Sequence, residues 1–449
     1  MTRPESTDGH EATAAPPAGD AAGSPSKADR FRAGERFIGL RRIRPLWQAG
    51  VFMVSNGLVS VLGVVSSAIL ARHLTTSRFG AYALAISFLQ LSSLVFDFGL
   101  SPSAARLAAL GDGRARRETV GAAAVLYLPV ACAYSLAIVG LSFGVDGWFH
   151  VHVGSALRIA APVALAIPAA QTVQRLAQGV DRLHVASLST LFMQLLLIAL
   201  LVVAVSVDGS LSLTAAVVIR CAAVLVSVVV AITWLRPLFR GAKQRIAEII
   251  RHTRRYGFQV YVGHLLSIGT YNMDVLMIGA LANSRSVGFY SLAGSVAGAA
   301  GLPVLGMSSA LFASMARAPR IRTYWILLAI VIGTVSALLA WALADPFIRF
   351  AFSPRYAPAA ALVLPLALAQ AVRGVTGVYN TFLSSHGRGR QLRNAAFVLT
   401  ASNLIFNFAL IPPFGAVGAA WASLAALIVN LAAHVVFYRA SLREPASDR

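Results

Sequence analysis

The feature that most constrains this chain is a repeated alternation of long apolar stretches with short arginine-rich tracts. Between residues 47 and 438 we find twelve apolar stretches, each close to the roughly 20 residues that an α-helix needs to cross a bilayer. Charged residues make up only 12% of the chain, about half the share of a soluble domain. The sequence therefore predicts an all-α polytopic membrane protein. It excludes soluble enzymes, secreted disulfide scaffolds and ordinary nucleic-acid-binding domains.

The twelve predicted transmembrane helices fall into two sets of six, joined by the longest polar connection. They are 47–71, 80–105, 119–142, 157–178, 185–206, 211–235, 256–281, 288–315, 323–344, 359–384, 394–411 and 416–438. We expect an N-lobe at 47–235, a basic cytoplasmic linker at 236–255 and a C-lobe at 256–438. We expect two cytoplasmic tails, at 1–46 and 439–449. The tail at 1–46 is rich in Pro, Ala, Gly and Ser, so we expect it to be disordered.

Lysine and arginine are distributed unevenly over the predicted loops. The loops on the side of the N-terminus carry 25 of them and the opposite loops six. Because cytoplasmic loops are the more basic ones, this bias places both termini in the cytoplasm. The net charge of +21 therefore suits anionic membrane lipids and does not indicate a nucleic-acid partner.

The two sets of six helices show an internal repeat. With one inserted residue, Gly80 and Tyr82 align with Gly288 and Tyr290. An even number of helices per half gives both halves the same orientation, so the repeat is parallel, with a pseudo-twofold axis along the membrane normal. A central cavity between two such lobes is typical of a carrier.

Polar residues recur at helical intervals along three predicted helices and so form a polar stripe on one face of each. We take residues of these stripes as candidate substrate-binding residues: Asn56 in the first span, Gln90 in the second, and Gln370, Arg373 and Asn380 in the tenth. A guanidinium suits phosphate or carboxylate. Two structural alternatives stay open: close packing of small residues in the first span, and an ion pair of Arg373 with a buried carboxylate.

Two carboxylates lie within the predicted spans. Asp97 lies in the second span, and Asp274 in the seventh shares a stripe with His264 and Tyr271. Intramembrane carboxylates and histidines can carry protons or Na⁺, so we assign these four residues to ion coupling. The alternatives are an ion pair of Asp97 with an arginine and a packing role for His264. Arg220, a further arginine within a span, lacks polar neighbours on its own helix and ranks lower.

No motif for catalysis, a cofactor or a metal is present. The chain has no Walker sequence, and its two cysteines, Cys132 and Cys221, lie in apolar stretches, which argues against a metal cluster or a disulfide. We therefore expect a non-enzymatic carrier without a cofactor.

Several motifs occur in a distinctive order. Residues 56–58 read Asn-Gly-Leu, 71–74 Ala-Arg-His-Leu, 79–82 Phe-Gly-Ala-Tyr, 97–101 Asp-Phe-Gly-Leu-Ser and 105–106 Ala-Arg. Gln-Gly at 178–179 and Phe-Gly-Ala-Val-Gly-Ala at 414–419 follow. This series resembles the polysaccharide (Wzx-type) flippases of the multidrug/oligosaccharidyl-lipid/polysaccharide exporter superfamily over residues 47–438.

The resemblance implies a function and a location. Such flippases move undecaprenyl-diphosphate-linked oligosaccharides across the bacterial cytoplasmic (inner) membrane by alternating access, driven by an H⁺ or Na⁺ gradient. It also implies a cationic central cavity, for which Arg72, Arg106, Arg175 and Arg373 are the candidates. Polysaccharide polymerases and glycosyltransferases are candidate partners. The alternative is a cation-coupled drug antiporter of the same superfamily, which would need Asp97 or Asp274 in a cation-sized pocket.

Overall fold

The computed structural model describes residues 54–149, 151–311, 315 and 318–443. The predicted tail at 1–46, the start of the first span and residues 444–449 lie outside these ranges. So do the side chains of His264 and Tyr271, although both residues belong to a described helix. Residues Gly50–Arg449 form one compact unit.

The described residues are helical and contain no β-strand. Eight helices are long and apolar enough to cross a membrane, and a ninth is added if the pair Gly154–Ala164 and Ala166–Gly179, bent by 45°, is counted as one span. These findings confirm the predicted all-α polytopic membrane fold. The number twelve and the symmetry of the two lobes stay predictions.

The first half of the unit begins with an unlabelled helix, Val54–His73. It continues with α2 (Thr76–Val95), α3 (Leu100–Leu110), α4 (Gly113–Phe149), α5 (Gly154–Ala164), α6 (Ala166–Gly179), α7 (Leu183–Asp208) and α8 (Leu213–Leu235). Two short elements, α9 (Ala242–His252) and a π-helix at Thr253–Gly257, lead to the second half. The predicted linker at 236–255 is therefore largely helical.

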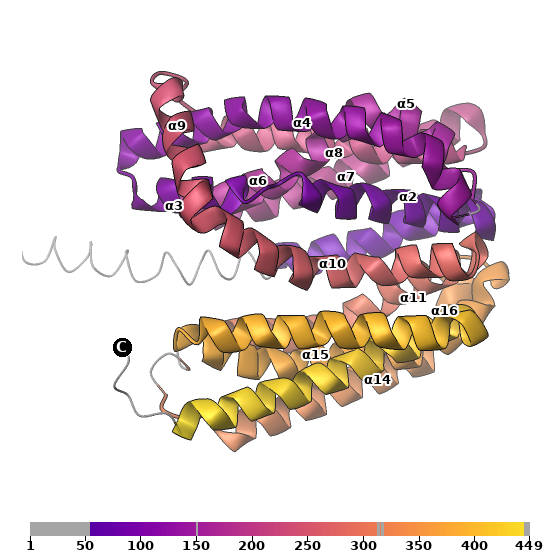
Figure 1. Cartoon of the computed structure of the whole chain (residues 1–449). Coiled ribbons are helices and arrows are strands. Elements are labelled where there is room, and N and C mark those ends of the chain that lie inside the picture. The colour runs from indigo at the N-terminus through magenta and orange to yellow at the C-terminus, as the bar shows by residue number, and fades with distance from the viewer. Residues whose placement is uncertain (1–53, 150, 312–314, 316–317, 444–449) are drawn as a thin grey trace, which may run out of the picture. The chain divides into compact units, whose positions relative to one another are not determined.

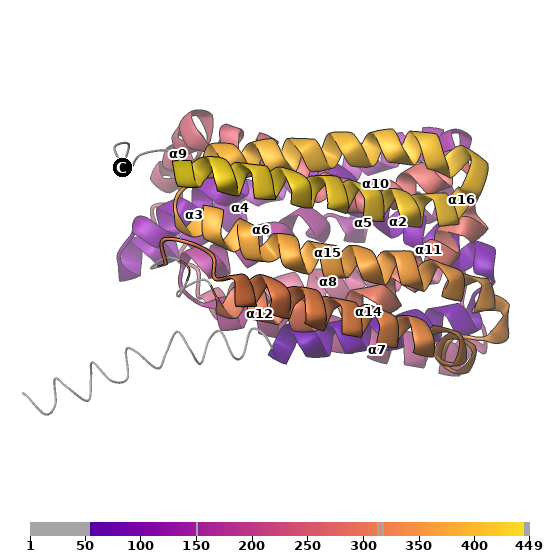
Figure 2. The same ribbon diagram turned by 90° about the horizontal axis from the view of Figure 1, so that it is seen from below.

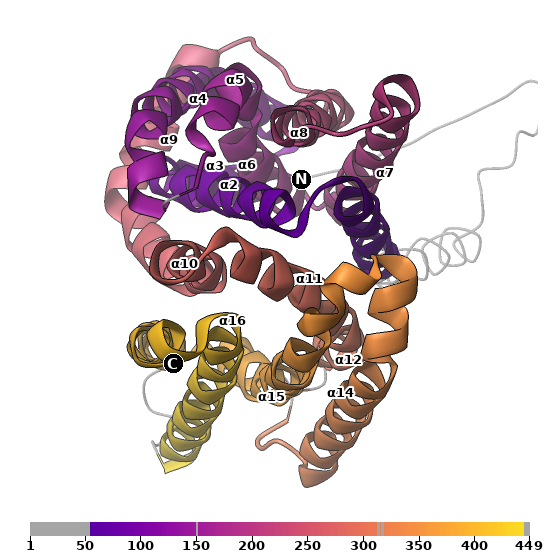
Figure 3. The same cartoon turned by 90° about the vertical axis from the view of Figure 1, so that its right-hand side faces the viewer.

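The second half contains α10 (Phe258–Leu281), α11 (Ser284–Ala300), α12 (Leu302–Ala310), α14 (Thr323–Ala351), a 3₁₀-helix at Pro354–Ala359, α15 (Ala360–Ser385) and α16 (Gly389–Arg443). The helices of the two halves run with their long axes nearly parallel (Figure 1), and α14 packs along α15 (Figure 2). Seen along the helices, α10 and α11 lie between α2 and the pair α15 and α16 (Figure 3). These two helices therefore connect the halves.

Several predicted spans are broken within their length. The span predicted at 80–105 is not one helix: Phe98 (φ 47°) and Gly99 (φ 80°) adopt left-handed backbone conformations and separate α2 from α3. The span at 288–315 breaks at Gly301 between α11 and α12. Gly415 (φ 57°, ψ −131°) interrupts α16 between the predicted spans at 394–411 and 416–438. Apolar length alone could not show the first two breaks, because a break of a few residues leaves the hydropathy of a span almost unchanged.

The two halves approach each other closely between α2 and α11. A Cβ atom added to Gly80 would lie 1.6 Å from the Ser284 carbonyl oxygen, and one added to Gly288 would lie 2.7 Å from the Thr76 carbonyl oxygen. Only glycine lets the two backbones approach this closely. The motif glycines that align in the two halves therefore meet at the contact between them.

Candidate functional site

A cavity of about 460 Å³ lies between the two halves. Helices α2, α7 and α8 and the helix Val54–His73 supply one side of it, and α11, α12 and α15 supply the other. Its polar lining residues are Ser60, Ser66, Ser67, Tyr82, Gln194, Arg220, Ser295, Gln370 and Arg373. Among the described residues that line it, none is acidic. We refer to it as the central cavity.

Two arginines from opposite halves line the central cavity. Arg220 comes from α8 and Arg373 from the middle of α15. An arginine at bilayer depth costs about 2.5–3.5 kcal/mol on insertion scales, so two of them in one cavity indicate a shared task. Guanidinium groups bind phosphate and carboxylate oxygens through two parallel hydrogen bonds. The cavity is therefore suited to an anionic group.

Arg220 is held in place by a chain of neutral side chains. Its Nη1 lies 3.4 Å from Gln194 Oε1. Gln194 Nε2 in turn donates to Ser66 Oγ at 2.7 Å and to the Leu62 carbonyl at 3.1 Å. No carboxylate lies within ion-pair distance of Arg220 in the described residues, so its charge is oriented without being neutralised.

The structure brings some of the predicted substrate-binding residues together and separates others. Gln370 and Arg373 line the central cavity, and Asn380 lines a second cavity that also contains Arg373. Arg106 and Asn56 are exposed, and Gln90 is half-buried; none of the three lines a described cavity. Arg72 instead donates to the carbonyls of Phe350 and Ala351.

Asp97 occupies the break between α2 and α3. Its carboxylate accepts hydrogen bonds from the Ser101 backbone N–H at 3.3 Å and from the hydroxyls of Ser101 and Tyr127. Thr172 extends this network through its hydroxyl, 3.0 Å from Ser101 Oγ. The left-handed turn at residues 98–99 directs the chain so that the carboxylate and the first turn of α3 meet. The motif at 97–101 therefore has a local structural basis.

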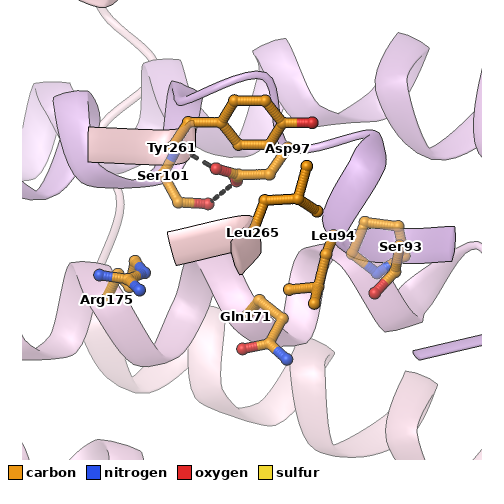
Figure 4. A pocket seen from close by; sticks show the side chains of 9 residues that line it. Ser93, Leu94, Asp97, Ser101, Gln171, Arg175, Tyr261 and Leu265 are labelled. Carbon is orange, nitrogen blue, oxygen red and sulfur yellow. Dashed lines mark hydrogen bonds between the residues drawn. The ribbon is translucent and has the colours of Figure 1, made fainter. Parts of the chain in front are cut away.

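The space beside Asp97 is small. Arg175, Gln171 and Tyr261 line it together with Asp97 and Ser101 (Figure 4). Its volume is about 10 Å³, which is room for about one water molecule. Arg175 is thus placed next to a site for water or a small ion and not in the central cavity.

Of the two carboxylates predicted to couple ions, Asp97 and Asp274, Asp274 is the more deeply buried. It is only 5% exposed. It accepts hydrogen bonds from Tyr290 Oη (2.7 Å), Asn403 Nδ2 (3.0 Å), Asn407 Nδ2 (2.6 Å) and Ser423 Oγ (2.7 Å). The donors come from α11 and from α16 on both sides of the Gly415 break. The carboxylate thus ties three helical segments to its own helix, α10, through neutral groups.

The oxygen atoms around Asp274 are of the kind that coordinate a cation. Hard cations prefer carboxylate, amide and hydroxyl oxygens, and the cluster supplies all three. Asn407 Oδ1 is buried and has no hydrogen-bond partner in the described part of the chain. The arrangement can therefore take up a proton or a small cation by exchanging hydrogen bonds within the cluster.

Comparison with known proteins identifies the family. The family model described as polysaccharide biosynthesis protein matches residues 46–318. This chain belongs to the polysaccharide biosynthesis protein family. The match confirms the resemblance seen in the motifs. No curated protein matches the chain.

Solved structures show that this family member shares its fold with lipid and drug transporters. It is similar to the lipid II flippase MurJ in an inward closed conformation, with a TM-score of 0.71 at 14% identity over 86% of this chain and 87% of that one. An inward-facing multidrug resistance MATE transporter of the MOP superfamily gives 0.68 at 14% identity over 85% and 94%. The Vibrio cholerae MATE transporter VcmN gives 0.63 at 12% identity over 90% and 97%. At this identity the likeness shows the fold alone.

Proposed function

We propose that the chain is a flippase that translocates undecaprenyl-diphosphate-linked oligosaccharide across the bacterial cytoplasmic membrane. The observation that supports this most is that Arg220 and Arg373, from opposite halves, both line a cavity that has no acidic lining residue in the described structure. A diphosphate has the charge and the oxygen geometry that two guanidinium forks recognise. Membership of the polysaccharide biosynthesis family supports a glycan-linked substrate.

The proposed mechanism is alternating access. The diphosphate and the sugars enter the central cavity, while the prenyl tail stays in the lipid beside the protein. Arginines from both halves contact the same anion, so binding favours closure of the halves around it. The cavity then opens to the other side. No covalent chemistry is required, and we propose that the chain is a transporter and not an enzyme.

We assign ion coupling to the Asp274 cluster, with the Asp97 site as a second candidate. Asp274 connects α10, α11 and α16, so a bound H⁺ or Na⁺ would change the contacts of three segments at once. Both termini face the cytoplasm in this proposal, because the loops on their side carry most of the Lys and Arg. Polymerases and glycosyltransferases of polysaccharide assembly are the proposed partners.

A cation-coupled drug antiporter is the second candidate, favoured by the similarity to MATE transporters. A cationic drug would need a negative group in its pocket. The described central lining provides two arginines and no acid, and the Asp97 space is too small for a drug. These observations favour the flippase.

The deciding experiment is lipid extraction from cells that lack the protein. We expect completed diphosphate-linked oligosaccharides to accumulate and surface polysaccharide to be lost, and the mass of the trapped lipid would identify the sugar. Normal glycolipids combined with new sensitivity to cationic drugs would contradict the flippase and support the antiporter.

A further inference from the structure

The position that Asp274 has in the second half is taken by a serine in the first half. The repeat alignment that places Ser77 on Ser284 also places Ser67 on Asp274. Asp274 is enclosed by hydrogen-bond donors and is only 5% exposed, whereas Ser67 lines the central cavity. The first half therefore has no carboxylate where the second half holds one.

Polar groups surround this position in both halves. In the second half, the donors to the Asp274 carboxylate come from the eighth, eleventh and twelfth predicted spans, which are the second, fifth and sixth of that half: Tyr290, Asn403, Asn407 and Ser423. In the first half, the second, fifth and sixth predicted spans supply three polar residues to the central cavity: Tyr82, Gln194 and Arg220. Corresponding spans therefore surround a carboxylate in one half and line a cavity in the other.

The Tyr82 hydroxyl opens onto the central cavity without a partner. The side chain is 9% exposed and lines the cavity. Its hydroxyl oxygen forms no hydrogen bond with the described residues, and it is not one of the fully enclosed polar atoms that lack a partner, so it is accessible from the cavity. Tyr290, which the alignment places on Tyr82, donates to Asp274 Oδ2 at 2.7 Å. A phenol that binds a carboxylate in one half is thus available to an anion in the other.

Arg220 supplies positive charge beside this hydroxyl. Its guanidinium lies within electrostatic range of the Tyr82 side chain, and Gln194 connects it to Ser66, the residue next to Ser67. No carboxylate lies within ion-pair distance of Arg220 in the described residues. The site in the second half is a fixed anion held by neutral donors. The site in the first half consists of neutral donors and a fixed cation, and therefore requires an anion from outside the chain.

We infer that a phosphate group of the substrate binds in the first half at the position that corresponds to the Asp274 carboxylate of the second half. The hydroxyls of Tyr82 and Ser67 donate hydrogen bonds to its oxygens, and the Arg220 guanidinium adds a charge-assisted bond. This inference rests on the proposed function and deepens it, because it places a phosphate in the first half and adds two hydroxyls to its ligands.

Removal of a single hydroxyl tests the role of Tyr82. The probe is farnesyl diphosphate, a short prenyl diphosphate, titrated by calorimetry into the purified full-length protein. Tyr82→Phe keeps the ring, and we expect it to weaken binding about tenfold, the contribution of one hydrogen bond to a charged group. Equal binding by the parent protein and Tyr82→Phe would overturn the inference.

The matched control is Tyr356→Phe, which makes the same chemical change elsewhere. The Tyr356 hydroxyl also lacks a partner in the described residues, and the side chain is 0% exposed, but it does not line the central cavity. We expect this variant to bind farnesyl diphosphate as the parent protein does. The same loss in Tyr356→Phe as in Tyr82→Phe would overturn the assignment of the hydroxyl to the site.

A carboxylate introduced at Ser67 should fill the site. Ser67→Asp gives the first half the residue that the second half carries, and we expect its carboxylate to displace the phosphate, so that binding falls below detection while the melting temperature stays the same or rises. Ser67→Asn has the same shape without the charge and should retain measurable binding. Ser60→Asp adds the same charge to the cavity lining two turns earlier and should cost less. Equal losses in Ser60→Asp and Ser67→Asp would overturn the position of the site.

Competing phosphates identify the source of the anion. Inorganic phosphate and dioctanoylphosphatidylglycerol, each in about tenfold excess, should displace little farnesyl diphosphate. Displacement by either would overturn the assignment to the substrate, because the site would then serve that other phosphate.

The outcome for Arg220 separates this inference from the proposed function. Binding that is lost in Arg220→Ala but unchanged in Tyr82→Phe and Ser67→Asp would overturn the inference and leave the flippase standing. No binding of farnesyl diphosphate by the parent protein would also overturn the inference, while lipid extraction from cells that lack the protein tests the flippase independently.

Discussion

Arg72 and Arg355, which belong to opposite halves, each donate hydrogen bonds to backbone carbonyls of the other half. Arg72 donates from Nε to the Ala351 carbonyl at 2.8 Å and from Nη2 to the Phe350 carbonyl at 2.5 Å. Arg355 Nη2 donates to the carbonyls of Ala71 and Arg72 itself, each at 2.7 Å. These four bonds connect the end of the first helix with the end of α14 in the other half. They hold the halves together at one end of the unit.

A disulfide near this connection should lock the transporter. Ser77 Oγ and Ser284 Oγ are 2.7 Å apart, one on each half. In a background with Cys132→Ala and Cys221→Ala, we expect oxidised Ser77→Cys/Ser284→Cys to crosslink and to lose export. Reduction of the disulfide should restore export, and each single cysteine should export normally whether oxidised or reduced. Full export by the crosslinked protein would show that this end of the halves does not separate during transport.

Removal of one arginine should loosen the same end. Arg355→Ala removes two hydrogen bonds at an exposed site, where such interactions are worth roughly 1 kcal/mol in total. We therefore expect about a fivefold faster reaction of Ser77→Cys with a membrane-impermeant maleimide. Arg349→Ala, at an exposed arginine paired within its own helix with Asp345, is the control and should leave the rate unchanged. An equal rate in Arg355→Ala and its parent would contradict a closing role for the arginines.

The two central-cavity arginines, Arg220 and Arg373, should be needed for binding the substrate and not for folding. We expect Arg220→Ala and Arg373→Ala each to reduce export about tenfold or more, since a charge-assisted bond contributes about 1.5–3 kcal/mol. Protein levels in the membrane should stay normal. Arg373→Lys keeps the charge but loses the planar fork, so partial export is expected. Arg393→Ala, at an exposed arginine, is the control; normal export by both cavity variants would remove the arginines from the site.

The Asp274 cluster should carry the ion dependence. Asp274→Asn keeps the shape of the side chain and removes its charge. In vesicles, we expect flipping of lipid-linked saccharide by this variant to be insensitive to an imposed H⁺ or Na⁺ gradient, while the parent protein is stimulated. Ser423→Ala removes one donor and should retain a reduced response. A normal gradient response in Asp274→Asn would move ion coupling to Asp97, where Asp97→Asn provides the same test.

The glycine contact between α2 and α11 should tolerate no side chain. Gly80→Ala would place a Cβ atom 1.6 Å from a backbone oxygen, so we expect strong loss of the protein from the membrane. Gly140→Ala is the matched control, because no atom lies within 4 Å of its added Cβ. Wild-type levels of Gly80→Ala, measured by immunoblot of membranes, would argue against this close approach.

The sequence predicts cavity-lining residues where several polar residues recur at helical spacing along a single helix. The stripe on the tenth predicted span contains Gln370 and Arg373, and both residues line the central cavity. Arg220 lacks polar neighbours on its own helix, so the helical pattern gives it little weight, and its partner Gln194 lies on a different helix, α7. Helical periodicity describes one helix and cannot show which helices meet, so a contact between helices escapes it.

Other buried polar residues do show a pattern in the sequence: they occur in pairs four residues apart within apolar stretches. Asn403 and Asn407 are spaced by four in an apolar stretch, as are Asn430 and His434, and both pairs prove to be buried. For Arg72 no such signal exists, because a terminal arginine that binds backbone carbonyls looks the same in sequence as one that binds phosphate. The geometry of the opposing backbone decides between the two roles.

The charge of the central cavity has a consequence for the return step of the proposed cycle. In the proposed cycle, bound diphosphate compensates the positive charge of the cavity, so the loaded protein moves little net charge across the bilayer. Without substrate, the Arg220 guanidinium has no carboxylate within ion-pair distance in the described residues, so its charge is not compensated. A charge that crosses 100 mV gains or loses about 2.3 kcal/mol, and a cell interior that is negative attracts a positive charge. The membrane voltage would therefore act mainly on the empty carrier and reset it toward the cytoplasm, which makes recovery, and not delivery, the electrically driven half of the cycle.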